Sequence, residues 1–189
     1  MIQTIFPHYF YSIISPPNKK EIIRFLNNAP ASSLDQPEWA NGCEIKVESL
    51  SPQSVGSILT DTIFTYFGEL GINFCPKVEL LSIWKNTYNK GYYQEMHDHH
   101  TTEGCDVSGV VFFNDWVEGA SQFYFYNKFF AELSTSWLKI VNQNELTSHA
   151  FFIKPKAGDI ILFPSYMLHG VTMHKINQKR TTVAFNISL

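Results

Sequence analysis

Hydrophobic residues recur at helical spacing in two segments of the N-terminal third of the chain. In residues 51–71 the apolar positions fall close to a period of 3.6, which predicts an amphipathic helix. These positions are Val55, Ile58, Leu59, Ile63, Phe67 and Leu70. Ser51 is expected to cap this helix, Pro52 to occupy its first turn and Gly71 to end it. A shorter helix is expected within residues 15–30, which prolines flank on both sides.

Beyond Pro76 the pattern changes to short runs rich in β-branched and aromatic residues, broken by Gly, Pro, Asn and Asp. With two runs nearer the N-terminus, strands are predicted within residues 4–14, 43–48, 77–88, 106–115, 121–127, 149–155, 159–174 and 180–188. Helices followed by many short strands, without helices between them, favour an antiparallel barrel or jelly roll with helices on its outside.

The chain is expected to form one domain over residues 1–189, since no repeat or long Pro/Gly linker divides it. Within it, residues 1–75 would support a β core formed by residues 76–189. Residues 128–149 form a polar insertion between strands. A long insertion of this kind is either a lid over a site or a plain surface loop.

Composition narrows the class of protein. Hydrophobic residues make up 44% of the 189 residues and charged residues 16%, which is typical of a globular protein, and 15% aromatic residues favour β structure. The formal charge of −3 predicts no generic binding to nucleic acid or anionic membranes. Cys43, Cys75 and Cys105 form no CxxC pair, and we find no signal peptide or membrane-spanning run. We therefore expect free thiols and a cytoplasmic protein without a membrane partner.

A histidine cluster, HDHH at residues 97–100, is the strongest candidate for chemistry. Residues two apart in a strand point to the same face, about 6.6 Å apart along the strand. His97 and His99 would then project together and could bind one ion, while Asp98 would face the other way. Taken alone, the cluster could equally be a solvated polar loop.

Two residues further along the chain strengthen this hypothesis. His169 lies between Leu168 and Val171 and needs a partner if it is buried, either an ordinary hydrogen bond or a metal ion. Arg180 shares one face of the final strand with Thr182. A guanidinium inside a barrel suits a carboxylate bound through two hydrogen bonds, and the Thr182 hydroxyl could add a donor. A surface arginine in a weak ion pair is the alternative.

Together these segments resemble the Fe(II)/2-oxoglutarate-dependent oxygenases, in particular the small bacterial and phage-type branch related to prolyl hydroxylases. The resemblance extends over most of the chain. It is carried by the stretches FPHYFY, IWKNTYNKGYYQEMHDHH, SGVVFFN, GDIILFPSYMLHGV and RTTVAFN.

The resemblance implies a mainly β fold, a double-stranded β-helix (a jelly-roll or cupin-like barrel) flanked by N-terminal helices. It implies Fe(II), 2-oxoglutarate and O2 as cofactors and the hydroxylation of a C–H bond. The substrate stays open among a small molecule, a protein side chain and a nucleobase. His97 and His169 match the two histidines that hold iron, and Arg180 matches the arginine that binds 2-oxoglutarate. Asn86, on the strand before the histidine cluster, is a further candidate for the co-substrate pocket.

The sequence departs from the family at one position. His99 stands where most members have a carboxylate, so the site would be a three-histidine variant of the usual two-histidine, one-carboxylate set. Because histidine is neutral and a carboxylate is negative, iron bound in such a site would carry one more positive charge than in the usual site. Asp98, His100, Glu103 or Asp106 could instead supply the third ligand.

Two other classes of function compete with this interpretation. The first is a cupin metalloenzyme that does not use 2-oxoglutarate, with Glu103 as a fourth ligand, because Gly91, His97, His99 and Gly109 approach a cupin motif. The second is a non-catalytic metal-binding module. We favour the oxygenase for three reasons. The gap between His99 and His169 is longer than compact cupins usually have, helices precede the barrel, and Arg180 stands at the co-substrate position.

Overall fold

The computed structural model describes residues 10–33, 45–72, 77–99, 102–128 and 148–189. Its helices are α1 (Lys19–Asn28), α2 (Pro52–Val55), the 3-10 helix η1 (Gly56–Leu59) and α3 (Thr60–Glu69). Its strands are β1 (Ser12–Ile14), β2 (Ala31–Ser33), β3 (Lys46–Leu50), β4 (Glu79–Tyr88), β5 (Gln94–His97), β6 (Val107–Phe112), β7 (Phe123–Tyr126), β8 (Ala150–Phe152), β9 (Ile160–Pro164), β10 (His169–Val171) and β11 (Arg180–Ser188).

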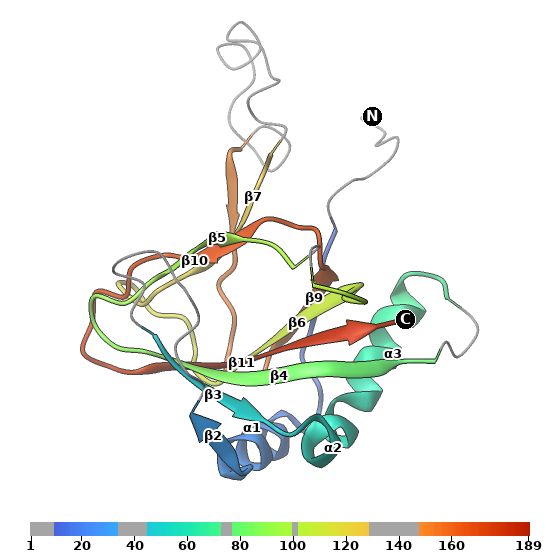
Figure 1. Cartoon of the computed structure of the whole chain (residues 1–189). Coiled ribbons are helices and arrows are strands. Elements are labelled where there is room, and N and C mark those ends of the chain that lie inside the picture. The colour runs from blue at the N-terminus through green and yellow to red at the C-terminus, as the bar shows by residue number, and fades with distance from the viewer. Residues whose placement is uncertain (1–9, 34–44, 73–76, 100–101, 129–147) are drawn as a thin grey trace, which may run out of the picture.

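The strands form two antiparallel sheets that face each other. The larger sheet has the order β1-β9-β6-β11-β4-β3-β2, and the smaller has the order β5-β10-β7-β8. In Figure 1 the helices cover the outer face of the larger sheet, and the smaller sheet lies on its other side. The predicted mainly β fold, a double-stranded β-helix with helices outside, is confirmed.

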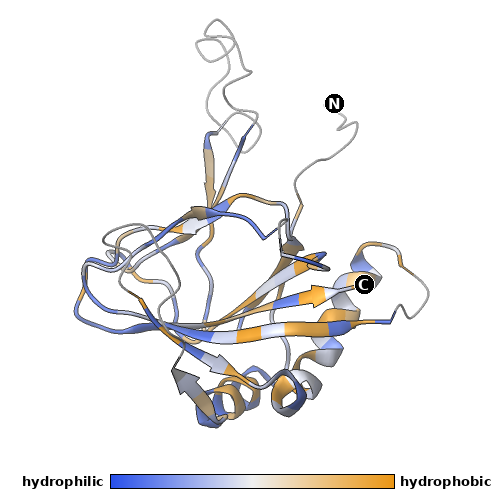
Figure 2. Cartoon of the chain, viewed as in Figure 1, coloured by the Kyte–Doolittle hydropathy of each residue, from blue (hydrophilic) through white to orange (hydrophobic). Residues whose placement is uncertain are grey.

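Strand β11 sits at the centre of the larger sheet and is buried on both of its faces. Val183, Phe185 and Ile187 belong to the core cluster between this sheet and the helices. Ala184 belongs to a second cluster between the two sheets. This alternation is the ordinary period of two along a strand, and Figure 2 shows how hydrophobic the central strands are. The polar residues of β11 on the same face as Ala184 therefore point into the space between the sheets.

The predicted helix over residues 51–71 is present but interrupted. The chain forms α2, changes to 3-10 geometry at Gly56–Leu59 and then continues as α3. Ser51 is the N-cap residue and Pro52 begins α2, as predicted, but the Ser51 hydroxyl bonds the Gln53 side chain and makes no capping hydrogen bond. Gly71 does end α3 with φ 74°, and the Ile72 N–H donates to the Phe67 carbonyl across the turn, as in a Schellman motif.

Several other expectations can be compared with the structure. The strand within residues 43–48 is found as β3, whereas β2, which pairs with it, was not predicted.

The insertion at residues 128–149 falls almost entirely outside the described residues. Within the described ranges, no helix has both the length and the apolar character needed to cross a bilayer. The single-domain organisation stays a prediction.

The packing of β6 against β11 predicts a strong effect of one small substitution. Gly109 on β6 pairs directly with Phe185 on β11, and a Cβ at residue 109 would overlap the Phe185 ring. Because this core cannot absorb another carbon without movement, we expect Gly109→Ala to lower the free energy of unfolding by about 1–3 kcal/mol in urea denaturation.

Gly68→Ala is a matched control. Gly68 lies in α3, and a Cβ there would meet no atom within 4 Å. Alanine is the better helix former, so this variant should keep or slightly raise stability. Equal stabilities for the two variants would contradict the packing described for β6 and β11.

Candidate metal centre

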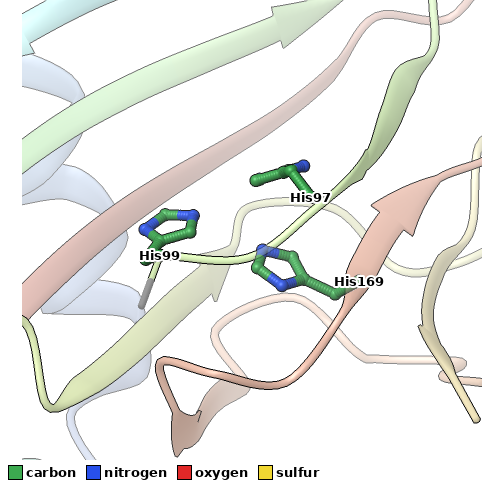
Figure 3. Close-up of side chains that lie close together, drawn as sticks. All are labelled: His97, His99 and His169. Carbon is green, nitrogen blue, oxygen red and sulfur yellow. The ribbon is translucent and has the colours of Figure 1, made fainter. Parts of the chain in front are cut away.

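Three histidines converge in the space between the two sheets. His97 ends β5, His169 begins β10, and the two residues are paired across the smaller sheet. His99 follows two residues after His97, and its ring reaches the same place (Figure 3). One ligand nitrogen from each ring lies within 4.8 Å of the others, and the His97 and His169 ring centroids are 4.3 Å apart. The predicted convergence of the three imidazoles is therefore observed.

His99 reaches this point in a way that the sequence pattern did not indicate. We expected His97 and His99 on one face of one strand, but β5 ends at His97 and His99 lies beyond it. The His99 N–H donates to the Ser165 carbonyl at 2.9 Å, which holds this segment against the turn after β9. The prediction that His99 lies on the same strand as His97 was therefore wrong, but the two rings do converge as predicted.

All three rings are oriented by a hydrogen bond at Nδ1. His97 Nδ1 lies 2.8 Å from the Glu95 carbonyl oxygen, and His169 Nδ1 lies 2.8 Å from the Met167 carbonyl oxygen. His99 Nδ1 lies 2.9 Å from the side-chain Oδ1 of Asn186. Backbone carbonyl oxygens can only accept, so Nδ1 of His97 and of His169 carries the proton and Nε2 keeps its lone pair. These two rings are thus in the tautomer that can bind a metal through Nε2, and the Asn186 amide, with Oδ1 facing His99, favours the same tautomer there.

Burial keeps these rings uncharged. Desolvation lowers the pKa of His97 and of His169 below the ordinary value, and it lowers the pKa of His99 to about 4. The His169 ring also packs against the rings of Phe123 and Phe163, with centroids 5.4 Å and 4.9 Å away. Neutral imidazole is the form that binds divalent iron. The donor set therefore fits a metal ion of that kind at neutral pH.

The lowered pKa values predict how the stability of the metal-free protein depends on pH. A histidine whose pKa is lower in the folded state is protonated first in the unfolded chain, so stability is lost as pH falls below about 6.5. For His99, whose folded pKa is about 4, the loss between about pH 7.5 and about pH 5 should be about 1–2 kcal/mol.

Urea denaturation of chelator-treated protein at the two pH values measures this loss. Carboxylates also titrate at the lower end, so the comparison with His99→Gln isolates the histidine. The variant should lose less stability on acidification than the wild-type protein. An identical loss in both proteins would show that His99 is not held neutral by the fold.

The histidines share their pocket with a buried arginine. The pocket lies between the sheets, and its lining includes the three histidines, Asn86, Tyr88, Arg180 and Thr182. The Arg180 guanidinium carbon lies 4.8 Å from the centre of the Tyr88 ring, and burial lowers the pKa of Arg180. Its Nη1 is buried without a hydrogen-bond partner among the described residues. A buried N–H of this kind requires an acceptor, and an anionic ligand would supply one.

The two other predicted pocket residues lie beside Arg180. Thr182 is on the same face of β11 and pairs with Asn86 of β4 across the sheet. Asn86 Oδ1 is also buried without a hydrogen-bond partner in the described part of the chain. All six candidate site residues thus line one pocket.

Among the alternative third ligands, the described residues Asp98, Glu103 and Asp106 are not part of the cluster. The structure groups His97, His99 and His169 alone among the described His, Cys, Asp and Glu residues. Asp106 instead accepts a hydrogen bond from the Leu189 N–H at 2.9 Å. His100 lies outside the described residues.

Sequence reasoning missed two polar residues that contact the histidines. Gln94 places its side-chain Nε2 3.4 Å from His97 Nε2, as a donor to an unprotonated ring nitrogen. Asn186 holds the Nδ1 of His99. A signal for Asn186 was present, since it is a polar residue in an apolar strand, an even number of positions from Arg180 and Thr182. No comparable pattern marks Gln94.

Comparisons with known proteins show which family the sequence matches. The family model described as "Putative 2OG-Fe(II) oxygenase" matches residues 82–186, more than half of the chain. None of the curated proteins compared with the sequence matches it.

Three solved structures share the fold at low sequence identity. An oxidoreductase of the 2OG-Fe(II) oxygenase family from Burkholderia pseudomallei is 13% identical, with 94% of this chain and 84% of that one covered and a TM-score of 0.63. A prolyl-4-hydroxylase from Pseudomonas putida is 12% identical, with 96% and 93% covered and a TM-score of 0.62. The viral collagen prolyl hydroxylase from Paramecium Bursaria Chlorella virus-1, a 2-oxoglutarate complex, is 14% identical, with 94% of each chain covered and a TM-score of 0.60.

Proposed function

This chain belongs to the 2OG-Fe(II) oxygenase family, and from that membership we propose how its pocket serves the reaction. His97, His99 and His169 bind Fe(II) through Nε2, and Arg180 binds a carboxylate of 2-oxoglutarate. The product is a hydroxylated C–H bond in a small molecule or a protein side chain. The observation that carries this proposal is the combination, in one pocket, of three neutral imidazoles and a buried guanidinium with an unsatisfied N–H.

The residues around the histidines support a metal role. His97, His99 and His169 would hold an iron ion as its three protein ligands. When bound, the iron would supply the oxidising chemistry of the reaction, with 2-oxoglutarate and O2 as co-substrates. The protein contributes the orientation of the three rings, through their Nδ1 hydrogen bonds. The apolar rings of Phe123 and Phe163 pack against His169 and would exclude water from that part of the pocket.

Arg180 supports the choice of co-substrate. Its guanidinium is planar and always charged, so it can bind a carboxylate with two parallel hydrogen bonds. Tyr88 and Phe112 lie against it at 4.8 Å and 5.6 Å and fix its place in the pocket. The Thr182 hydroxyl and the Asn86 side-chain amide lie beside it and are proposed as further contacts to the same carboxylate. Neither a cupin reaction without 2-oxoglutarate nor a passive metal site needs this arginine.

Anaerobic titration tests the proposed function. Fe(II) and 2-oxoglutarate added together should produce a weak visible charge-transfer band, and neither should produce it alone, because the band requires the co-substrate to chelate the metal. Succinate should then form when O2 is admitted. Iron binding that is indifferent to 2-oxoglutarate would contradict the proposal.

A further inference from the structure

His99 is held differently from its two neighbours. Backbone carbonyl oxygens orient His97 and His169, whereas a side chain, that of Asn186, orients His99. By the family resemblance drawn from the sequence, position 99 is where a carboxylate is expected and this chain has a histidine. A carboxylate has no ring to orient and no Nδ1–H to donate. A histidine at this position therefore needs an acceptor that an aspartate would not.

Asn186 is built into the sheet in a way that presents this acceptor. It lies on β11, is 4% exposed, and pairs across the sheet with Ser108 of β6. The Ser108 hydroxyl donates to Asn186 Oδ1 at 3.0 Å, the same oxygen that His99 Nδ1 approaches at 2.9 Å. An oxygen with two lone pairs can accept both bonds. With Oδ1, and not the NH2 group, facing His99, both contacts are hydrogen bonds to this one acceptor.

The rest of the surroundings leaves His99 little other freedom. The Trp84 ring stacks on the imidazole, with centroids 6.0 Å apart and planes 20° apart. The His99 N–H is bound to the Ser165 carbonyl, so the backbone is held as well. With the ring plane and the backbone restrained, the choice that remains is which nitrogen carries the proton and which faces the other histidines.

We propose that Asn186 is a positioning residue that holds His99 as the Nδ1–H tautomer, so that Nε2 is presented to the metal. This inference rests on the proposed function, in which His99 is a ligand. A residue that hydrogen-bonds the ring nitrogen not bound to the metal fixes the tautomer and orientation of a ligand histidine. Loss of such a residue typically weakens metal binding by about 10–100-fold. For His99 this residue is Asn186, so a single side-chain substitution can test its role.

Three substitutions separate an acceptor role from a donor role and from a merely structural one. Asn186→Asp keeps an oxygen acceptor and removes the NH2 donor. Asn186→Leu removes both at similar size. Ser108→Ala removes the second donor and leaves the bond from His99 intact. Fe(II) affinity is measured by anaerobic titration, with thermal unfolding as a check on each fold.

Asn186→Leu is expected to weaken Fe(II) binding by about 10–100-fold. Asn186→Asp and Ser108→Ala should stay within a few-fold of the wild-type protein. An Asp variant as weak as the Leu variant would show that Asn186 donates to His99, and it would overturn the proposal. So would unchanged affinity in Asn186→Leu. If the wild-type protein binds no Fe(II), the metal centre itself is wrong, and that outcome is distinct from both.

A second measurement needs neither a variant nor a metal. Nitrogen NMR of the metal-free protein with labelled histidines distinguishes a ring protonated at Nδ1 from one protonated at Nε2. We expect the His99 signals to be those of the Nδ1–H tautomer in wild-type protein and a mixture of tautomers in Asn186→Leu. A His99 ring protonated at Nε2 in wild-type protein would overturn the proposal even if Asn186→Leu fails to fold.

Discussion

His169→Ala is expected to abolish Fe(II) binding at working concentrations and, with it, the formation of succinate from 2-oxoglutarate. His169 is the most deeply buried of the three histidines, and it lies on β10, whereas His97 lies on β5 and His99 follows that strand. Removing a partner of a ligand already costs about 10–100-fold in affinity, so losing a ligand should cost at least about 100-fold. Anaerobic Fe(II) titration and a succinate assay measure the two effects.

His174→Ala is the matched control for this substitution. His174 is also a buried histidine, but its ring nitrogens are bound to the Ser121 N–H and the Gln178 carbonyl, away from the cluster. This variant should lose stability and keep its affinity for Fe(II). If His169→Ala binds Fe(II) as the wild-type protein does, the three-histidine centre is contradicted.

Arg180→Met is expected to raise the KM for 2-oxoglutarate on the order of 100-fold, while Fe(II) affinity without 2-oxoglutarate changes little. The guanidinium is buried, and its Nη1 has no hydrogen-bond partner in the described part of the structure. A charge-assisted pair with a carboxylate contributes about 1.5–3 kcal/mol, which corresponds to roughly 10–150-fold in affinity. Initial rates over a range of 2-oxoglutarate concentrations measure the change.

Two further variants define the cause of this effect. Arg180→Lys keeps the charge and loses the planar fork, so its KM should lie between those of the wild-type and the Met variant. Lys46→Met removes a positive charge from β3 at an exposed side chain and should leave the KM unchanged. A KM for 2-oxoglutarate that does not respond to Arg180→Met would place the co-substrate elsewhere.

The fold could be predicted from the chain to the extent that local pattern determines it. The change after Pro76 from helical spacing to short runs of β-branched and aromatic residues predicted the β core, and β4, β6, β9 and β11 lie within the predicted runs. The break between α2 and α3 could not be predicted, because the apolar spacing continues through η1. Strand β2 is three residues long and forms by pairing with β3, which local pattern does not show.

The candidate site was predictable where chemistry and spacing coincide. Histidines two apart, a third beside an apolar strand, and an arginine on the last strand marked the pocket, and the structure brings them together. Their supporting contacts depend on cross-strand register instead. Asn186 meets Ser108 because β11 pairs with β6 in one particular alignment, and the sequence around either residue does not contain that alignment.

A crystal structure of the protein loaded anaerobically with Fe(II) and 2-oxoglutarate, with anomalous differences measured at the iron absorption edge, tests the central claim most directly. The predicted result is a single iron peak within bonding distance of Nε2 of His97, His99 and His169, with a 2-oxoglutarate carboxylate on Arg180. A peak bound by Asp98 in place of His99, or a carboxylate remote from Arg180, would contradict it.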